Sequence, residues 1–132
     1  MIADVAKLLL IKDFHSRVLE ELKAIMVQGR AQDLLCTMLE ITGQEETTPE
    51  VSVLKIMNVA QELFSSDPTA ACIIMSQLYN FADNLYMHDV CDSIDIWIYQ
   101  HHSLELGTLL KKNFPSDIDD DMKRHYQGWV DG

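Results

Sequence analysis

The fold is decided by the stretch PTAACIIMSQLYNFADNLYM, residues 68–87. Its apolar side chains recur at helical spacing, but they are spread too widely around the helix to form a single buried stripe. We therefore predict a central helix that is buried on more than one side. Asp67 precedes Pro68, which is the pattern of a side-chain cap followed by proline at the first helical position.

Two helices are predicted at the start of the chain. Residues 2–26 repeat apolar side chains mostly at steps of three and four, which predicts one long amphipathic helix that ends near Gly29. Residues 30–41 predict a shorter helix, with Gly43 as its stop. Together these two helices are expected to form a first helical hairpin.

A polar linker is predicted at residues 43–48, between the first hairpin and the rest of the chain. It ends in Thr48 and Pro49, which repeat the pattern of a cap followed by proline. A third helix is therefore expected from this point to about Phe64. Two such helix starts are hard to obtain by chance, so they indicate an α-helical organisation.

The stretch HDVCDSIDIWIYQHH, residues 88–102, is rich in side chains that can carry chemistry. On a helical wheel, Asp92, Asp95 and His102 fall within about 40° of His88, which predicts an amphipathic helix with a solvated acidic face. Residues 94–99 also alternate as a strand would. No second alternating run offers a partner strand, so a helix is favoured and the strand stays open as an alternative.

The rest of the chain predicts short helical pieces. A segment around residues 109–112 is followed by the breaker NFPSD, and Ser116 is a candidate cap for a last amphipathic turn or two. The 132 residues are 48% hydrophobic, enough for one core. The sequence as a whole predicts an all-α fold, a single-domain bundle of five to six antiparallel helices over residues 1–132.

The net charge of the chain is -11, and its distribution is uneven. Between Lys55 and Lys111 there is no lysine or arginine, although several aspartates and glutamates lie in that span. Such a surface repels nucleic acid and anionic lipid and attracts basic partners. We therefore expect neither nucleic acid nor a membrane as partner. The longest apolar run is also far below the ~20 residues of a membrane span.

The chain contains none of the enzyme motifs sought. It has no G-x-S-x-G, no H-E-x-x-H and no phosphate-cradling glycine loop. Its cysteines, Cys36, Cys72 and Cys91, form no C-x-x-C pair, which favours reduced thiols in a cytoplasmic protein. The sequence therefore predicts a protein that is not an enzyme and has no cofactor.

A metal site is the sharpest alternative for residues 88–102. His88 and Asp92 are spaced to share one helix face, but His102 would lie roughly 21 Å further along the axis. A metal site needs ligands that converge from more than one element. We therefore predict no metal ligands, and a metal-binding protein that uses the His/Asp face of residues 88–102 stays an alternative.

The function that these features favour is a small acidic protein-binding module. It would act as a chaperone or regulator of a secreted or exported protein by holding the partner's helix or basic segment. A homodimer is a further possibility. The candidate contact residues are Tyr86, Met87, Asp89, Asp92, Asp95 and Tyr99. The alternative is an immunity or antitoxin-type inhibitor of a basic toxin or nucleic-acid-binding protein, in which carboxylates replace phosphates.

Residues 54–85 support the first of these functions through a resemblance. This segment resembles flagellin-export chaperones in its predicted helix pair and in the L-Y-x-F pattern at residues 78–81. The resemblance covers about a quarter of the chain. The N-terminal A-S-P-x-x-L motif of those chaperones does not occur here. What the resemblance implies is a helical protein that binds an exported partner.

Overall fold

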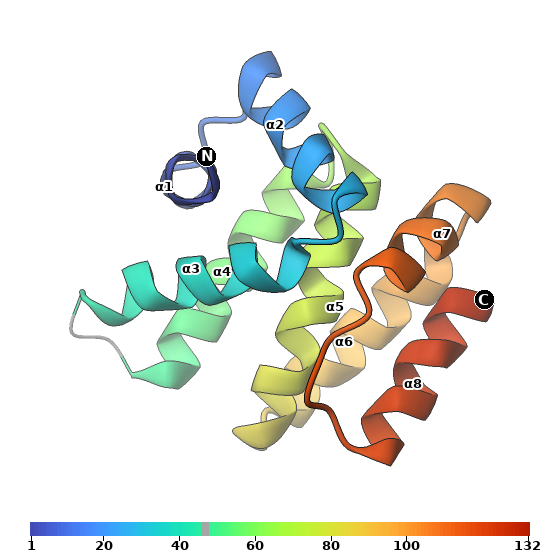
Figure 1. The fold of residues 1–132 in the computed structure, drawn as a ribbon. Coiled ribbons are helices and arrows are strands. Elements are labelled where there is room, and N and C mark those ends of the chain that lie inside the picture. Colours follow the sequence, from blue (N-terminus) through green and yellow to red (C-terminus); the bar gives the residue numbers. More distant parts are fainter. Residues whose placement is uncertain (46–47) are drawn as a thin grey trace.

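The computed structural model describes residues 1–45 and 48–132 and is all-helical over that part of the chain (Figure 1). Eight helices are formed there, and no strand. They are α1 (Ile2–Leu10), α2 (Ser16–Val27), α3 (Ala31–Gly43), α4 (Pro49–Leu63), α5 (Pro68–Asn84), α6 (His88–Gln100), α7 (Leu104–Lys112) and α8 (Asp120–Asp131).

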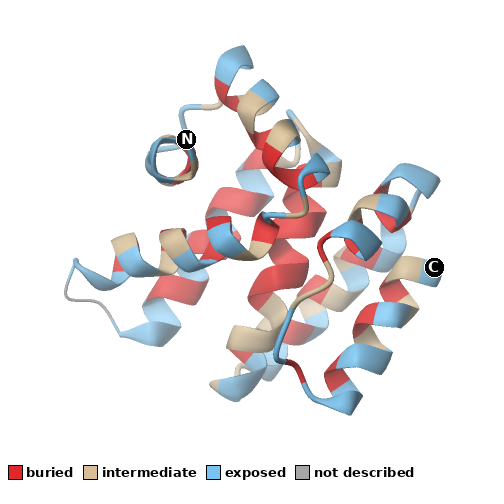
Figure 2. Cartoon of the chain, in the orientation of Figure 1, coloured by how far each residue is buried: buried red, intermediate tan, exposed pale blue. Residues whose placement is uncertain are grey.

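Helix α5 is the centre of the molecule. It packs against α2, α3, α4, α6 and α7. Every residue from Ala70 to Leu78 is buried, so α5 is enclosed on all sides through its first half (Figure 2). A helix without a polar face is expected only inside a protein. The predicted central helix, buried on more than one side, is confirmed.

The two predicted starts with a cap and a proline are also confirmed. The hydroxyl of Thr48 accepts a hydrogen bond from the backbone N–H of Val51, and the carboxylate of Asp67 accepts one from the N–H of Ala70. Each bond satisfies a backbone donor that has no partner inside its helix.

The prediction of one long helix over residues 2–26 is wrong. The chain breaks after α1, where Lys12 takes a left-handed conformation with φ of 59°, and α2 starts at Ser16 after the capping imidazole of His15. The positions of the apolar side chains around the helix axis explain the break. In one continuous helix Leu9 and Val18 would lie about 180° apart. Both are buried here, because the turn redirects the second helix.

Three of the described helices end in the same kind of turn. After α1, α2 and α5, the residue with positive φ is Lys12, Gly29 and Tyr86 respectively. In each turn, two backbone N–H groups bond back to carbonyls of the preceding turn of helix, as in a Schellman motif. Glycine is the usual residue at this position. The first of these stops was missed because a lysine stands where glycine is expected.

The linker prediction is met only in part. Helix α3 includes Gly43 as its last residue, so this glycine does not stand beyond the helix as predicted. The polar residues Gln44 and Glu45 follow, and α4 begins at Pro49. Residues 46–47 of the predicted linker lie outside the described part of the chain.

The ambiguous residues 94–99 are helical. They belong to α6, whose buried residues are Cys91, Ile94 and Ile98. This spacing of three and four is that of a helix with one inward face, while Ile96 is exposed on the other side. Tertiary packing therefore decides against the strand pattern that alternating isoleucines produce locally.

The C-terminal quarter is more helical than predicted. The segment predicted around residues 109–112 is the end of α7, which begins at Leu104, and α8 is a helix of 12 residues. The cap of α8 is Asp119, whose carboxylate accepts from the N–H of Met122 at 2.7 Å. Ser116, the predicted cap, bonds to the side chain of Gln32 in α3.

The all-α class is thus confirmed, but the predicted count of five to six helices was too low. In Figure 1, α1 is seen along its axis while α3 and α5 are seen from the side, so the helices do not all lie antiparallel. None of the described helices combines the length and the apolar character that a membrane crossing requires.

A buried polar cluster joins the C-terminal helices to the first half of the chain. The side chain of Asn113 accepts from the N–H of Ala31 at 2.9 Å and donates to the carbonyl of Met26 at 2.8 Å. The amide of Gln77 in α5 donates to the carbonyl of Asn113 and to the hydroxyl of Tyr126. These bonds fix α7 and α8 against the turn between α2 and α3.

Candidate protein-binding surface

Tyr86 and Met87, two predicted contact residues, form the turn between α5 and α6. Tyr86 is 80% exposed, and Met87 is half-buried at the N-terminal end of α6. The turn holds Tyr86 at φ of 58°, and its side chain faces solvent. The structure therefore presents an aromatic side chain that the core does not use.

A shallow groove lies beside this turn and encloses about 430 Å³. We call it the turn groove. Its lining residues are Leu54, Tyr86, Met87, His88, Asp89 and Val90. Leu54 comes from α4 and is 52% exposed, while the other residues come from the turn and the first residues of α6. None of them is a lysine or arginine, so the groove combines apolar walls with one carboxylate.

Asp89 and Asp92 are both exposed on α6. Asp89 lines the turn groove, and Asp92 follows three residues later, on the neighbouring turn of the same helix. Both carboxylates are available to a partner. Asp89 also lies in the first turn of α6, where a negative charge interacts favourably with the helix dipole.

Asp95 differs from these two aspartates, because it faces α8 instead of open solvent. Its Oδ1 accepts a hydrogen bond of 2.8 Å from the indole Nε1 of Trp129. The Nε2 of His125 lies 2.9 Å from the same oxygen, at ion-pair distance but without hydrogen-bond alignment. The side chain of Asp95 is only 34% exposed. The expectation that Asp92 and Asp95 share one solvated face is therefore wrong for Asp95.

Tyr99 is 46% exposed and also leans toward α8. A β-carbon on Gly128 would lie 2.7 Å from its hydroxyl oxygen, so the tyrosine side chain in this position lies directly against the backbone of α8. The ring of Tyr99 thus covers α8 on one side and meets solvent on the other. Sequence spacing alone did not show that Asp95 and Tyr99, four residues apart on α6, both meet the last helix.

The histidines of residues 88–102 do not converge. His88 is exposed at the start of α6, whereas His102 lies beyond its end, with Nε2 3.3 Å from the carbonyl oxygen of Val130. His101 packs its ring on Phe64, with ring centroids 4.4 Å apart. Among residues 1–45 and 48–132, no group of three or more His, Cys, Asp and Glu side chains is arranged to hold a metal ion.

Two buried cysteines and one tyrosine beside α6 favour their neutral forms. Burial raises the pKa of Cys72 to about 11 and that of Cys91 to about 11, where Asp83 and Asp92 add to the effect. Burial also raises the pKa of Tyr79 to about 12, helped by the charges of Cys91, Asp83 and nearby aspartates. These thiols are protonated at neutral pH and therefore poor nucleophiles.

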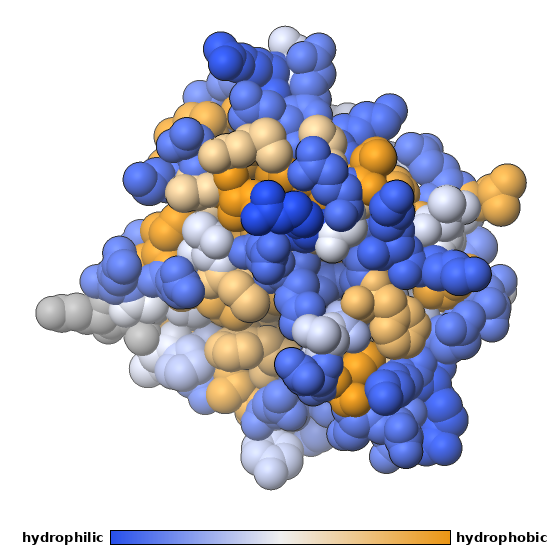
Figure 3. Space-filling model, in the orientation of Figure 1, coloured by the Kyte–Doolittle hydropathy of each residue, from blue (hydrophilic) through white to orange (hydrophobic). Residues whose placement is uncertain are grey.

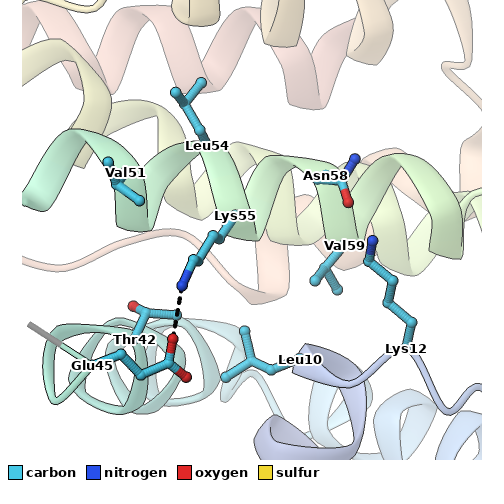
Figure 4. A pocket seen from close by; sticks show the side chains of 9 residues that line it. All are labelled: Leu10, Lys12, Thr42, Glu45, Val51, Leu54, Lys55, Asn58 and Val59. Atoms are coloured by element: carbon cyan, nitrogen blue, oxygen red, sulfur yellow. Dashed lines mark hydrogen bonds and ion pairs between the residues drawn. The ribbon is translucent and has the colours of Figure 1, made fainter. Parts of the chain in front are cut away.

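A second groove lies on the other side of α4 and encloses about 450 Å³ (Figure 4). We call it the α4 groove. Its walls include Leu10, Val51, Leu54 and Val59. The two ammonium groups at its rim are already paired, Lys12 with Glu62 at 2.6 Å and Lys55 with Glu45 at 2.7 Å. Leu54 lines both grooves, so apolar surface continues over α4 from one to the other.

Leu54 lines both grooves, although it is not among the contact residues predicted from sequence. Leu54 falls in the third predicted helix, together with Val51 and Val53. In α4, Val53, Ile56 and Met57 point inward, and Val51 and Leu54 lie on the exposed side. A helical wheel separates these two sets, so the signal was present in the spacing.

Apolar patches of this kind stand out because the rest of the surface is polar. On the face shown in Figure 3, hydrophilic side chains cover most of the molecule and apolar patches lie between them. Single exposed apolar residues are common in soluble proteins. A groove that joins several of them to an acidic helix is a better candidate for a contact surface.

Comparisons with protein-family models, with curated proteins and with solved structures found no match for this chain.

Proposed function

We propose that this protein binds a basic or amphipathic helical segment of a protein partner through the turn groove and the carboxylates of Asp89 and Asp92. The observation that carries this proposal is the position of an exposed apolar groove beside an acidic helix. All of its lining residues except Leu54 fall in the span between Lys55 and Lys111 that has no lysine or arginine. The apolar residues of the partner would be buried in the groove, and its basic residues would pair with the carboxylates.

Two of the residues predicted from sequence are left out of this surface. Asp95 is engaged by Trp129, and Tyr99 packs over Gly128, so both serve the attachment of α8. The proposed surface keeps Tyr86, Met87, Asp89 and Asp92, and it gains Leu54. Four of these five residues line one groove and Asp92 lies on the next turn of α6, whereas the six residues predicted from sequence are divided between this groove and the contact of α6 with α8.

A surface that covers the amphipathic segment of another protein suits a cytoplasmic chaperone or a regulator of an exported protein. An inhibitor of a basic toxin would depend on carboxylates above all. The apolar walls of the turn groove favour the first role, because Leu54, Met87 and Val90 offer no contact to a phosphate-binding surface. Competition by DNA for the partner would distinguish the inhibitor from the chaperone.

The test uses a labelled amphipathic peptide of leucine and lysine, about 18 residues long so that it can form several helical turns. Fluorescence anisotropy measures its dissociation constant for the whole protein. A peptide with glutamate in place of lysine is the control for charge. We expect the lysine peptide to bind and the glutamate peptide not to bind, with methyl NMR signals of Leu54 and Met87 shifting on binding.

A pair of charge reversals then locates the site. The double variant Asp89→Lys with Asp92→Lys is expected to weaken binding at least about tenfold. The matched control is Glu20→Lys with Glu40→Lys, which makes the same change of charge at exposed positions of α2 and α3. Equal losses in both double variants would mean that the peptide responds to net charge alone, and the proposed site would be wrong.

A further inference from the structure

Tyr86 occupies a backbone conformation that disfavours tyrosine. Its φ of 58° is left-handed, and the β-carbon of any residue other than glycine is crowded there. The bonds from the N–H groups of Tyr86 and Met87 to the carbonyls of Asp83 and Ala82 would form equally well with glycine at position 86. The turn itself therefore gives no reason for an aromatic residue.

The side chain of Tyr86 makes few contacts that stabilise the fold. Its exposed fraction is 80%, and its ring makes an edge contact with His88 at 6.5 Å between centroids. Lys12, in the equivalent position after α1, forms an ion pair with Glu62. A strained residue whose side chain faces solvent is a candidate for a functional role outside the fold.

The surroundings of the ring indicate which chemistry would bind there. Tyr86 shares the turn groove with the carboxylate of Asp89, the imidazole of His88 and apolar side chains, and none of the lining residues is a lysine or arginine. A guanidinium group fits both features, because it can stack on an aromatic face while it donates paired hydrogen bonds to a carboxylate. The ammonium group of lysine is more strongly hydrated and donates without that planar geometry.

We propose that Tyr86 and Asp89 together hold an arginine side chain of the partner's amphipathic segment. The guanidinium stacks on the phenol ring and pairs with the carboxylate, while apolar residues of the same segment contact Leu54 and Met87. This inference rests on the proposed function and adds that the site selects arginine over lysine. Tyr86 is then the residue that determines this specificity.

The test compares two labelled peptides of about 18 residues with identical leucines, one with arginine and one with lysine at every basic position. We expect the wild-type protein to bind the arginine peptide about threefold or more tightly than the lysine peptide. Tyr86→Gly should remove this preference and leave the urea midpoint unchanged or higher, because glycine relieves the backbone strain. Tyr86→Phe, which keeps the ring, should retain the preference.

Leu104→Ala is the matched control, since Leu104 is 87% exposed on α7 and lines neither groove. It should leave the preference for arginine unchanged. A preference that survives Tyr86→Gly would overturn the inference, as would a fall of the urea midpoint in that variant, which would give Tyr86 a structural role. Dimerisation lost in Tyr86→Gly, measured by light scattering, would assign the ring to a second copy and also overturn it.

The two proposals fail in different ways. If the lysine peptide binds and is weakened by the reversal of Asp89 and Asp92, but arginine gives no advantage, the proposed function stands and the role of Tyr86 is wrong. If neither basic peptide binds the wild-type protein, both proposals are wrong.

Discussion

The indole N–H of Trp129 donates a hydrogen bond to the carboxylate of Asp95, and this bond joins α8 to α6 between residues 34 positions apart in the chain. Trp129 is fully buried, so its N–H has no access to water. The bond therefore gives Asp95 a role in folding that the exposed aspartates of α6, Asp89 and Asp92, do not share. It also explains why an acidic residue lies on the border between the core and the surface.

Replacement of Asp95 by alanine should destabilise the protein by about 1–3 kcal/mol, because the buried indole N–H of Trp129 loses its acceptor. Asp92→Ala removes the same carboxylate three residues earlier on the exposed face and should change the free energy of unfolding by less than about 0.5 kcal/mol. Urea unfolding followed by tryptophan fluorescence measures both. Similar values for the two variants would show that the indole does not depend on Asp95.

The elements that could be predicted from sequence are those that are determined by interactions between residues close together in the chain. The side chains of Thr48 and Asp67 start α4 and α5 through bonds to backbone groups three residues away, and the even spread of apolar residues places α5 at the centre. The break at Lys12 was missed because this turn uses a lysine in place of glycine. A left-handed backbone conformation at a residue other than glycine cannot be recognised from the residue type.

The contact surface was harder to predict, because it depends on contacts between distant segments. Asp92 and Asp95 look alike on a helical wheel, and only the position of α8 separates them. Leu54 reaches the turn groove because α4 packs against α5 and brings it beside Met87. The charge of this region was readable from sequence, whereas the residues that form its walls required the fold.

Asn113 is expected to be among the most sensitive polar residues. Its side chain bonds to the backbone of Met26 and Ala31, and it is buried beside the turn between α2 and α3. Asn113→Ala leaves the buried N–H of Ala31 without its acceptor and removes one of the two donors to the carbonyl of Met26, which keeps the N–H of Gly29. We therefore expect a loss of about 1–3 kcal/mol in a urea titration. Asn58→Ala, at an exposed position of α4, should change stability little. A loss below about 1 kcal/mol at Asn113 would contradict this assignment.

Two glycines give a matched comparison of backbone requirements. Gly29 has φ of +73°, and a β-carbon there would lie 2.8 Å from the carbonyl oxygen of Lys112. Gly29→Ala should therefore cost about 1–3 kcal/mol. Gly43 ends α3 and has no atom within 4 Å of an added β-carbon, so Gly43→Ala should be neutral or stabilise by up to about 1 kcal/mol. Thermal unfolding of both variants checks the opposite signs, and destabilisation by both would refute the argument.

Stability should fall at alkaline pH. Burial raises the pKa values of Cys72 and Cys91 from 9.0 to about 11, so the folded state holds these protons more tightly than the unfolded state does. This contribution is fully present below about pH 9 and is lost as the pH rises toward 11. Tyr79, whose pKa is raised from 10.0 to about 12 by burial and by neighbouring negative charges, extends the loss to higher pH.

The urea midpoint should therefore be nearly constant from about pH 7 to pH 8 and should decrease steadily above about pH 9. In the double variant Cys72→Ala with Cys91→Ala, the absolute stability is lower because two buried side chains are shortened, but the decrease between about pH 9 and pH 11 should be shallower. The slope against pH is thus the informative quantity. If the slope of the double variant equals that of the wild-type protein, other groups cause the alkaline loss and the two thiols do not contribute to it.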